Sequence, residues 1–240
     1  MNLTNNTVFI SGGSAGLGLE IAKKFSASGN KVIINGRDQT RLDNALNLLN
    51  NAVGIQGDLS IESERIRISE ELKQNHPDLN VVINNAGLAY AYSLAESDET
   101  YENARKEINT NYLSIIHFNE LLLPNLREKS DAAIVNVTSI LSFIPTLTIP
   151  TYSTSKAALK AYTQLLRKSL AQTNVRVFEL IPPLVNTEFS AGSGGENGID
   201  PKEVADELWI AFEKNQLDVP VGKSKVVYSI FQEAISKLTK

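Results

Sequence analysis

The 240-residue sequence contains no cysteine. Disulfide bonds, thiol nucleophiles and thiolate-ligated metal ions are therefore excluded as features of this protein. Only two histidines are present, and we predict no metal site. A chain without cysteine is compatible with a reducing compartment, and we expect the protein to be cytoplasmic.

Long hydrophobic runs and basic clusters are also missing. No stretch approaches the roughly 20 consecutive apolar residues needed to span a bilayer, and residues 1–6 lack the layout of a secretory signal. The net charge is -4 without a basic patch, which argues against a nucleic acid or an anionic membrane as a partner. Because 42% of the residues are apolar, we expect a globular protein with a sizeable core and no membrane insertion.

Short apolar runs alternate with helical patterns along the whole chain. This alternation is typical of a parallel sheet. We predict an α/β, Rossmann-like, doubly wound parallel sheet of about seven strands with helices on both faces, forming a single domain over residues 1–240. The strands are expected at residues 8–10, 31–35, 53–57, 80–83, 132–137, 175–181 and 217–221, and the helices at 19–25, 41–49, 62–74, 98–129 with an interruption near Pro124, 152–171, 201–213 and 226–238.

A glycine-rich turn follows the first predicted strand and leads directly into a helix. Its glycines are Gly12, Gly16 and Gly18, which do not match the spacing G-x-G-x-x-G literally. The context of strand, glycine turn and helix allows a backbone to approach a pyrophosphate and to place it at a helix N-terminus. The alternative is a tight glycine turn without a ligand.

The same turn contains G-x-S-x-G, the nucleophile elbow of esterases, with Ser14 at its centre. That chemistry requires a histidine that follows an acid later in the chain. The only histidines are His76 and His117, and the second half of the chain, where such hydrolases normally carry theirs, has none. A hydrolase is therefore the weakest of the functions considered.

Charged residues stand at the ends of the second and third predicted strands. A dinucleotide enzyme meets the adenosine ribose at the end of its second strand, with an acid for a free 2′-hydroxyl or an arginine for a 2′-phosphate. Gly36 and Arg37 stand there, which favours NADP over NAD, although an arginine in a turn often only faces solvent. Asp58 ends the third strand, where a carboxylate can accept a hydrogen bond from an adenine amine.

Polar residues also follow the fourth and fifth predicted strands. Residues 84–87 read Asn-Asn-Ala-Gly, and their amides either brace the loops or line a cofactor channel. Asn111 lies within a predicted helix, where a polar amide caps the helix, faces water or marks a site. Ser139 leaves the fifth strand at the carboxyl edge of the sheet, which is where α/β proteins bind ligands.

Tyr152 and Lys156 stand four residues apart at the start of a predicted helix, so they lie on the same face about one turn from each other. A free tyrosine has a pKa near ~10, and a neighbouring ammonium lowers that pKa because it favours the phenolate. Tyr152 then becomes a candidate general acid or base. The spacing by itself is more often an ordinary surface pair.

Together these motifs resemble the short-chain dehydrogenase/reductase family along essentially the whole chain. The cofactor turn of the family, T-G-x-x-x-G-x-G, is matched by residues 11–18, with serine in place of the threonine. Its N-N-A-G motif is matched by residues 84–87. Its catalytic asparagine, serine, tyrosine and lysine are matched in order by Asn111, Ser139, Tyr152 and Lys156.

Three segments resemble a bacterial subgroup of these enzymes, the oxidoreductases named for D-alanine transfer to lipoteichoic acid. These segments are residues 3–7, 12–16 and 181–187. The subgroup name does not establish a substrate. One departure concerns the proline-glycine pair that usually follows the sixth strand, which is Pro182-Pro183 here and affects the loop on the nicotinamide side.

The resemblance implies an NADP-dependent oxidoreductase that transfers hydride between NADP(H) and a carbonyl or alcohol substrate, with NAD the less favoured cofactor. It implies that Tyr152 exchanges the proton, Ser139 hydrogen-bonds the same oxygen, Lys156 lowers the tyrosine pKa and holds the nicotinamide ribose, and Asn111 holds a water. The implied cofactor-binding residues are Gly12, Ser14, Gly16, Leu17, Gly18, Arg37, Asp58, Leu59, Asn85, Ala86, Gly87, Tyr152, Lys156, Pro182, Val185 and Thr187.

The stretches expected to meet the substrate are residues 88–93, 141–150 and 190–198, which are apolar or small. They favour an apolar or moderately bulky carbonyl compound. The last of these stretches is rich in glycine and serine, and it predicts a mobile lid over about residues 188–200.

The resemblance also implies a homodimer or homotetramer, in which the long helices beginning near Asp98 and Tyr152 pair between subunits. The alternative function is a non-catalytic dinucleotide-binding regulator or scaffold on the same fold, since a fold alone does not confer activity. A binding module, however, has no chemical reason to keep the four catalytic residues.

Overall fold

Seven parallel strands form one sheet in a computed structural model that describes residues 2–238. Their order is β3-β2-β1-β4-β5-β6-β7, so the chain winds outward from β1 to one edge and then from β4 to the other. The predicted fold class is confirmed. The strands are β1 (Thr7–Ser11), β2 (Lys31–Gly36), β3 (Ala52–Gln56), β4 (Leu79–Asn84), β5 (Ala132–Val137), β6 (Val175–Ile181) and β7 (Asp218–Pro220).

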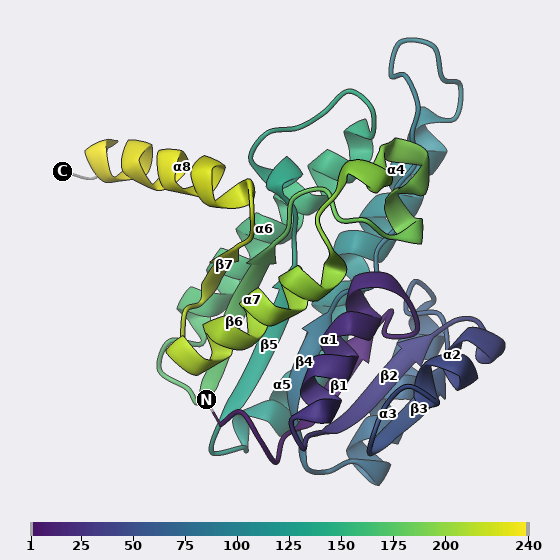
Figure 1. The fold of residues 1–240 in the computed structure, drawn as a ribbon, viewed down its shortest axis with the longest axis vertical. Helices are drawn as coiled ribbons and strands as arrows, with labels where there is room; N and C mark the ends of the chain where they lie inside the picture. Colours follow the sequence, from purple (N-terminus) through teal and green to yellow (C-terminus); the bar gives the residue numbers. More distant parts are fainter. Residues whose placement is uncertain (1, 239–240) are drawn as a thin grey trace.

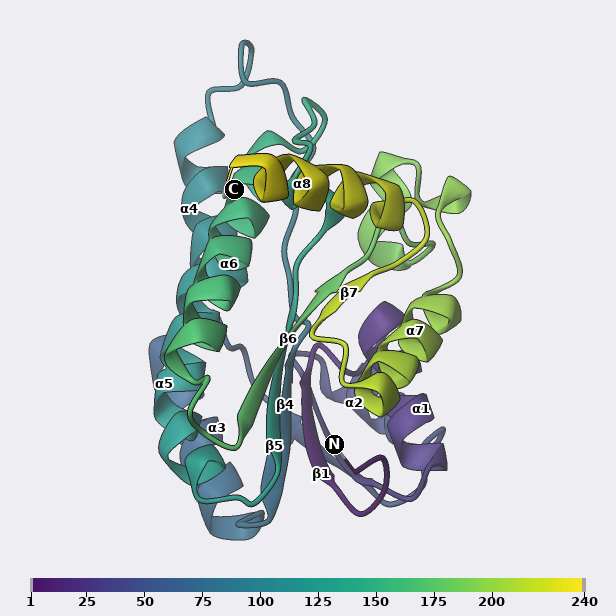
Figure 2. The same ribbon diagram turned by 90° about the vertical axis from the view of Figure 1, so that its left-hand side faces the viewer.

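Helices cover both faces of this sheet, and Figure 2 shows the three layers edge-on. One layer holds α1, α2 and α7, and the other holds α3, α4, α5 and α6, while α8 crosses above the strands. The helices are α1 (Gly16–Ala27), α2 (Gln39–Leu46), α3 (Glu62–Asn75), α4 (Thr100–Ile108), α5 (Ser114–Arg127), α6 (Pro150–Ser169), α7 (Pro201–Lys214) and α8 (Ser224–Leu238).

The five inner strands, β1, β2, β4, β5 and β6, are buried on both faces, because each of them divides its side chains between two apolar cores. In β1, Val8 and Ile10 belong to the core beneath α1 and α7, whereas Phe9 belongs to the core beneath α3 and α5. Within the first core, the rings of Phe25 on α1 and Phe212 on α7 lie with centroids 5.4 Å apart. Burying each such side chain stabilises the folded state by about 1.5–3 kcal/mol. The packed cores therefore hold the ends of the strands in fixed positions.

Glycine is required in the turn between β1 and α1 because two backbone segments nearly touch. A Cβ atom on Gly18 would lie 2.2 Å from the carbonyl oxygen of Gly12. Gly16 begins α1 with a φ of +52°, a region that favours glycine. The amide of Asn85 donates to the carbonyl oxygens of Ser11 and Gly12, at 3.0 and 3.2 Å, and so fastens the turn to the end of β4.

The helix expected over residues 98–129 differs from the prediction. It consists of α4 and α5, which are joined by a π-helical turn over Asn109–Leu113, and α5 continues through Pro124. The predicted interruption near Pro124 is wrong, because α5 tolerates the loss of the one backbone donor that proline lacks. The irregular turn instead lies at Asn111, and π-helical turns are frequent at functional sites.

Helix α8 projects from the body of the molecule, as Figure 1 shows. Phe231 and Tyr228 on this helix lie against Phe143, with ring centroids 5.2 and 6.2 Å apart. The ammonium of Lys160 is 4.4 Å from the centroid of the Phe143 ring. No helix within residues 2–238, α8 included, is both long and apolar enough to cross a bilayer.

Candidate active site

A cleft of about 920 Å³ opens where the strands end, at the point between β1 and β4 where the winding of the sheet reverses. Such a switch point is the usual ligand site of open parallel sheets. All predicted cofactor and catalytic residues except Asn111 line this cleft. They are Gly12, Ser14, Gly16, Leu17, Gly18, Arg37, Asp58, Leu59, Asn85, Ala86, Gly87, Ser139, Tyr152, Lys156, Pro182, Val185 and Thr187.

The glycine turn presents the N-terminus of α1 to the cleft. No side chain caps this end, where Ala15 stands at the N-cap, so the backbone donors of the first turn suit an anion. The hydroxyl of Ser11 accepts hydrogen bonds from the backbone nitrogens of Asn85 and Ala86, both at 3.0 Å. The serine that replaces the threonine of the motif therefore still joins this turn to the end of β4.

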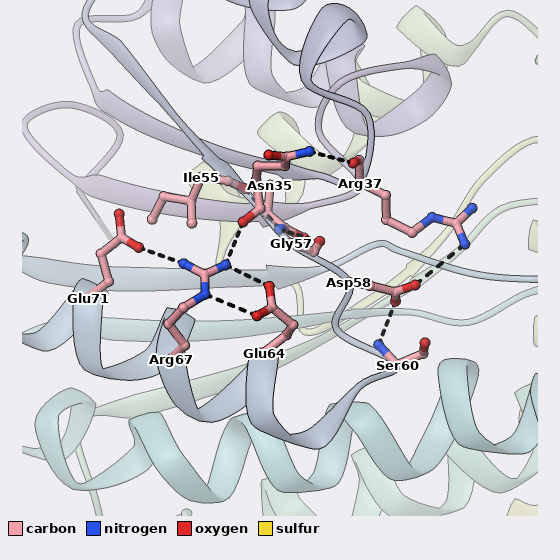
Figure 3. Close-up of polar contacts among 10 residues, drawn as sticks. Asn35, Arg37, Ile55, Gly57, Asp58, Ser60, Glu64, Arg67 and Glu71 are labelled. Carbon is pink, nitrogen blue, oxygen red and sulfur yellow. Dashed lines mark hydrogen bonds and ion pairs between the residues drawn. The ribbon is translucent and has the colours of Figure 1, made fainter.

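The opposite end of the cleft carries the predicted adenosine residues, which Figure 3 shows together. The side chain of Arg37 is 74% exposed, and its guanidinium lies 3.7 Å from the carboxylate of Asp58. That carboxylate also accepts from the backbone nitrogen of Ser60 at 2.8 Å. Because this long contact is the one ion pair that the guanidinium of Arg37 makes within residues 2–238, the guanidinium remains available to an incoming phosphate.

An ion pair that was not predicted spans the cleft. Arg41 on α2 and Glu188, at the start of a 3-10 helix over Glu188–Ser193, form an ion pair of 2.8 Å. Both line the cleft, so the pair joins its two walls. Both side chains are more than half exposed, and an exposed pair contributes only about 0–1 kcal/mol. The two residues are 147 positions apart, so no local spacing in the sequence indicates the contact.

The loop after β6 is ordered despite the second proline of Pro182-Pro183. The carbonyl oxygen of Pro182 accepts from the backbone nitrogen of Ile140 at 2.9 Å. Val185 forms an isolated parallel bridge with Ile199. Thr187 caps the 3-10 helix through a reciprocal capping box with Ser190. These contacts hold Pro182, Val185 and Thr187 along one wall of the cleft.

Ser139, Tyr152 and Lys156 meet at the inner end of the cleft. Ser139 follows β5 and caps a short 3-10 helix, while the other two residues lie on the first turns of α6. The Lys156 ammonium donates to the carbonyl oxygen of Val137 at 2.8 Å and lies 5.6 Å from the centroid of the Tyr152 ring. This bond ties α6 to β5, so the helix that carries the tyrosine is fixed to the strand that leads to the serine.

Burial sets the protonation of this group. It raises the pKa of Tyr152 above the ordinary value, the charge of Glu107 acts in the same direction, and hydrogen bonding with Ser139 opposes both. The lowering of the tyrosine pKa by Lys156 stays a prediction; the Lys156 ammonium is not among the groups that shift this pKa in the structure, where it donates to the carbonyl oxygen of Val137. Tyr152 is thus protonated near neutral pH, while burial lowers the pKa of Lys156 to about 8.

Asn111 acts behind the cleft and not on its surface. Its buried amide accepts from the backbone nitrogen of Leu88 at 2.8 Å and donates to the carbonyl oxygen of the same residue at 2.8 Å. It also donates to the hydroxyl of Ser155 at 2.9 Å. Because both amide hydrogens are used, the side chain cannot donate to the predicted water.

The esterase alternative gains no support from the cleft. Ser14 lines it, but neither His76 nor His117 does, so this serine has no histidine base there. Within residues 2–238, no three histidine, aspartate or glutamate side chains gather in a way that could hold a metal ion.

A family model described as short chain dehydrogenase matches residues 6–197. The chain belongs to the short-chain dehydrogenase family. It is therefore an NAD(P)-dependent oxidoreductase that uses a nicotinamide dinucleotide. An uncharacterized oxidoreductase, DltE of Bacillus subtilis, is 38% identical over 212 residues, which cover 88% of this chain and 84% of the relative. The predicted resemblance to this subgroup is confirmed.

Solved structures of the family share the fold. A short chain dehydrogenase from Burkholderia cenocepacia in complex with NADP has a TM-score of 0.84 and 26% identity, covering 97% of this chain and 93% of that one. A family member from Burkholderia phymatum in complex with NAD has a TM-score of 0.86 but only 18% identity, with 91% and 89% covered, and supports the fold alone.

The buried Lys156 makes a pH-dependent contribution to stability that can be measured. Because its folded-state pKa of about 8 lies below the ordinary 10.5, the unfolded chain binds more protons between these values, and the free energy of unfolding rises as the pH increases through this window. We expect a rise on the order of 3 kcal/mol at most. Urea titrations across the window should show this rise in the wild type and its loss in Lys156→Met.

Lys168→Met is the matched control, because Lys168 lies exposed on the same helix. It should keep the rise of the wild type. An unchanged rise in Lys156→Met would show that this lysine is not deprotonated on burial.

Proposed function

We propose that this chain is an NADP(H)-dependent carbonyl reductase or alcohol dehydrogenase with Tyr152 as the acid and base. The observation that carries the proposal is one cleft with Ser139, Tyr152 and Lys156 at its inner end and Arg37 at its outer end. The uncapped N-terminus of α1 lies between them and suits the pyrophosphate of a dinucleotide. The bound nicotinamide supplies or accepts the hydride.

The protein itself handles one proton and one oxygen. In the reducing direction, the protonated Tyr152 donates its proton to the oxygen of the carbonyl substrate as negative charge develops there. The hydroxyl of Ser139 hydrogen-bonds the same oxygen and stabilises that charge. Lys156 uses one donor for the carbonyl of Val137, so its ammonium has further donors for the hydroxyls of the nicotinamide ribose.

The preference for NADP rests on Arg37. Its guanidinium lies at the end of β2, where a 2′-phosphate arrives, and its only ion pair within the described residues is the long contact with Asp58. Arg41 lines the same end of the cleft and adds a second positive charge. Asp38, Asp58 and Glu188 also line the cleft, and Arg41 is already paired with Glu188 at 2.8 Å, so the weakly held guanidinium of Arg37 is the group that favours a phosphate over a free hydroxyl.

The apolar side chains of the cleft favour an apolar carbonyl compound. Leu88, Leu141, Ile149 and Leu184 line the cleft together with the catalytic residues. The ring of Phe189 lies 5.9 Å from the ring of Tyr152, measured between centroids. Its segment, residues 188–200, serves in this proposal as a lid that covers the substrate and excludes water.

A homo-oligomer is supported by an apolar groove between α5 and α6. Its volume is about 330 Å³, and it is lined mainly by Ile116, Leu123, Pro124, Tyr162 and Leu166. Beside it, Leu165 on α6 is 64% exposed. Apolar surface of this kind marks contact sites between proteins, and in our proposal a second copy of the chain covers it.

A non-catalytic regulator on the same fold is the second candidate. A dinucleotide-binding module needs the glycine turn and Arg37, but it has no use for a lysine whose burial lowers its pKa to about 8 beside a buried tyrosine. Burying this lysine costs stability, and only a catalytic role gives a reason for that cost, so its presence favours the enzyme over the regulator.

Replacing Tyr152 with phenylalanine tests the chemistry directly. Tyr152→Phe removes the proton donor but keeps the ring, so we expect unchanged NADPH binding and a turnover reduced about 10²- to 10⁴-fold for any carbonyl compound that the wild type reduces. Nicotinamide fluorescence reports the binding, and loss of NADPH absorbance reports the turnover. Full turnover in this variant would refute the role of Tyr152, whereas a wild type that binds NADPH and reduces no carbonyl compound would favour the regulator.

Replacing Arg37 with alanine tests the choice of cofactor. We expect the wild type to bind NADPH more tightly than NADH, and Arg37→Ala to weaken NADPH binding about 10- to 100-fold while NADH binding stays nearly constant, because only the 2′-phosphate is lost as a partner. Fluorescence titrations with each cofactor measure both constants. A wild-type preference for NADH would contradict the Arg37 argument and leave the reductase proposal intact.

Light scattering coupled to size-exclusion chromatography tests the assembly. We expect a dimer or tetramer for the wild type and monomers for Leu165→Glu, because a charge in an apolar interface must lose its hydration. Leu48→Glu is the control, since Leu48 is similarly exposed, at 60%, but lies beyond α2. A monomeric wild type would contradict the proposed oligomer.

A further inference from the structure

Helix α4 and the π-helical turn that follows it are joined to α6 by two hydrogen bonds. The carboxylate of Glu107, near the end of α4, accepts a hydrogen bond from the hydroxyl of Thr151. The amide of Asn111, four residues later, donates to the hydroxyl of Ser155 at 2.9 Å. Matching intervals of four residues on both helices fix one against the other in a single register.

This register bears directly on the catalytic group. Thr151 immediately precedes Tyr152, and Ser155 immediately precedes Lys156. A shift of either bond would rotate or translate the first turns of α6 and move the phenol relative to Ser139. The two bonds therefore affect the catalytic group, although neither Glu107 nor Asn111 lines the cleft.

The same two side chains also hold the loop that follows β4, at alternate residues. Asn111 binds both backbone groups of Leu88, each at 2.8 Å. Glu107 accepts from the backbone nitrogen of Tyr90 at 2.7 Å. Figure 1 shows this loop rising above the strands beside α4, and Leu88 lines the cleft. Two side chains thus hold the backbone of this loop at alternate residues.

Glu107 is an unusual residue for this position. Its side chain is fully buried, and burial raises the pKa of its carboxyl group. It forms no ion pair with any residue in the described part of the chain. Both of its partners, the Tyr90 amide and the Thr151 hydroxyl, donate to it, so both carboxylate oxygens act as acceptors, whereas a glutamine would keep one acceptor oxygen and turn its amide nitrogen toward one of the partners.

The surroundings of Glu107 connect it to further parts of the substrate pocket. The hydroxyls of Tyr92 and Thr151 lie 2.5 Å apart, and the backbone nitrogen of Tyr92 donates to the carbonyl oxygen of Thr148 at 3.2 Å. Among the described residues, neither Lys106, whose ammonium lies 5.9 Å from the centroid of the Tyr90 ring, nor Lys156 beside Tyr152 forms an ion pair with Glu107. The negative charge of Glu107 therefore faces the catalytic tyrosine without a direct counter-ion.

We propose that Glu107 is a positioning residue of the reductase site, which clamps the substrate-facing loop at Tyr90 to the first turn of α6 at Thr151. The proposal rests on the function proposed above, in that the clamp holds Tyr152 for proton transfer. The clamp itself is inferred from the two hydrogen bonds of Glu107 and does not depend on the proposed function.

Hydrogen exchange of the Tyr90 amide, followed by NMR in the full-length protein, tests the clamp without any turnover. In Glu107→Ala the amide loses its acceptor, and we expect its exchange to become roughly tenfold faster or more. Glu107→Gln keeps one acceptor oxygen for two donors, so an intermediate acceleration is expected. Glu102→Gln, the same change on the exposed face of α4, should match the wild type.

Kinetics with NADPH and a carbonyl compound test the effect on the site. We expect Glu107→Ala to raise KM and to lower kcat more than tenfold in protein that remains folded. In the wild type, kcat/KM for reduction falls when Tyr152 loses its proton at high pH. Because the charge of Glu107 raises the pKa of Tyr152, removing it in Glu107→Gln should move this fall toward lower pH, whereas Glu102→Gln should leave it in place.

The two readouts separate the clamp from the proposed function. A wild type that reduces no carbonyl compound would overturn the proposed function. The hydrogen exchange of the Tyr90 amide would still show whether Glu107 holds the loop. Exchange in Glu107→Ala at the wild-type rate, or an unshifted alkaline fall in Glu107→Gln, would overturn the role of Glu107. If Glu107→Ala does not fold, Glu107→Gln provides the same two readouts.

Discussion

The hydrogen bond from the Lys156 ammonium to the carbonyl oxygen of Val137 is the contact on which the arrangement of the site depends. It joins a helix to a strand end, and each of these carries one more catalytic residue a short distance away. A buried ammonium is costly unless it is hydrogen-bonded, so the lysine is driven to find this carbonyl. The burial that makes the bond necessary also shifts the pKa values of Lys156 and Tyr152 in opposite directions.

Around this contact, the sheet determines where chemistry can occur. Parallel strands bring all their carboxyl ends to one edge, and the reversal of winding between β1 and β4 opens that edge into a cleft. The near contact between Gly18 and Gly12 keeps α1 close enough for its N-terminus to face the cleft. The glycine turn and the group of Ser139, Tyr152 and Lys156 are thus held in one cleft by the same sheet.

Much of this arrangement could be predicted from the sequence, because strands with apolar residues on both faces leave short runs that are rich in apolar residues. The run at residues 175–181 coincides with β6, and the run at residues 132–137 with β5. Glycine spacing and the interval between Tyr152 and Lys156 likewise depend on local geometry. Features of this kind are visible in a single sequence because they involve residues that are neighbours along the chain.

The features that could not be predicted arise from contacts across the fold or from burial. The pKa of Tyr152 depends on burial, which the residue interval does not reveal. The pair of Arg41 and Glu188 joins residues far apart in sequence. The π-helical turn at Asn111 has no distinctive composition, whereas the proline nearby suggested a break in the wrong place. Glu107 left one local signal, a charge four residues before Asn111.

The loop after β4 is attached to the helix through its own backbone atoms at Leu88 and Tyr90. A segment held in this way does not need particular side chains to keep its shape. Its side chains can therefore vary during evolution, or in a library of designed variants, while the catalytic group stays in place. This separation of anchoring from recognition is one route by which a single scaffold acquires many substrates.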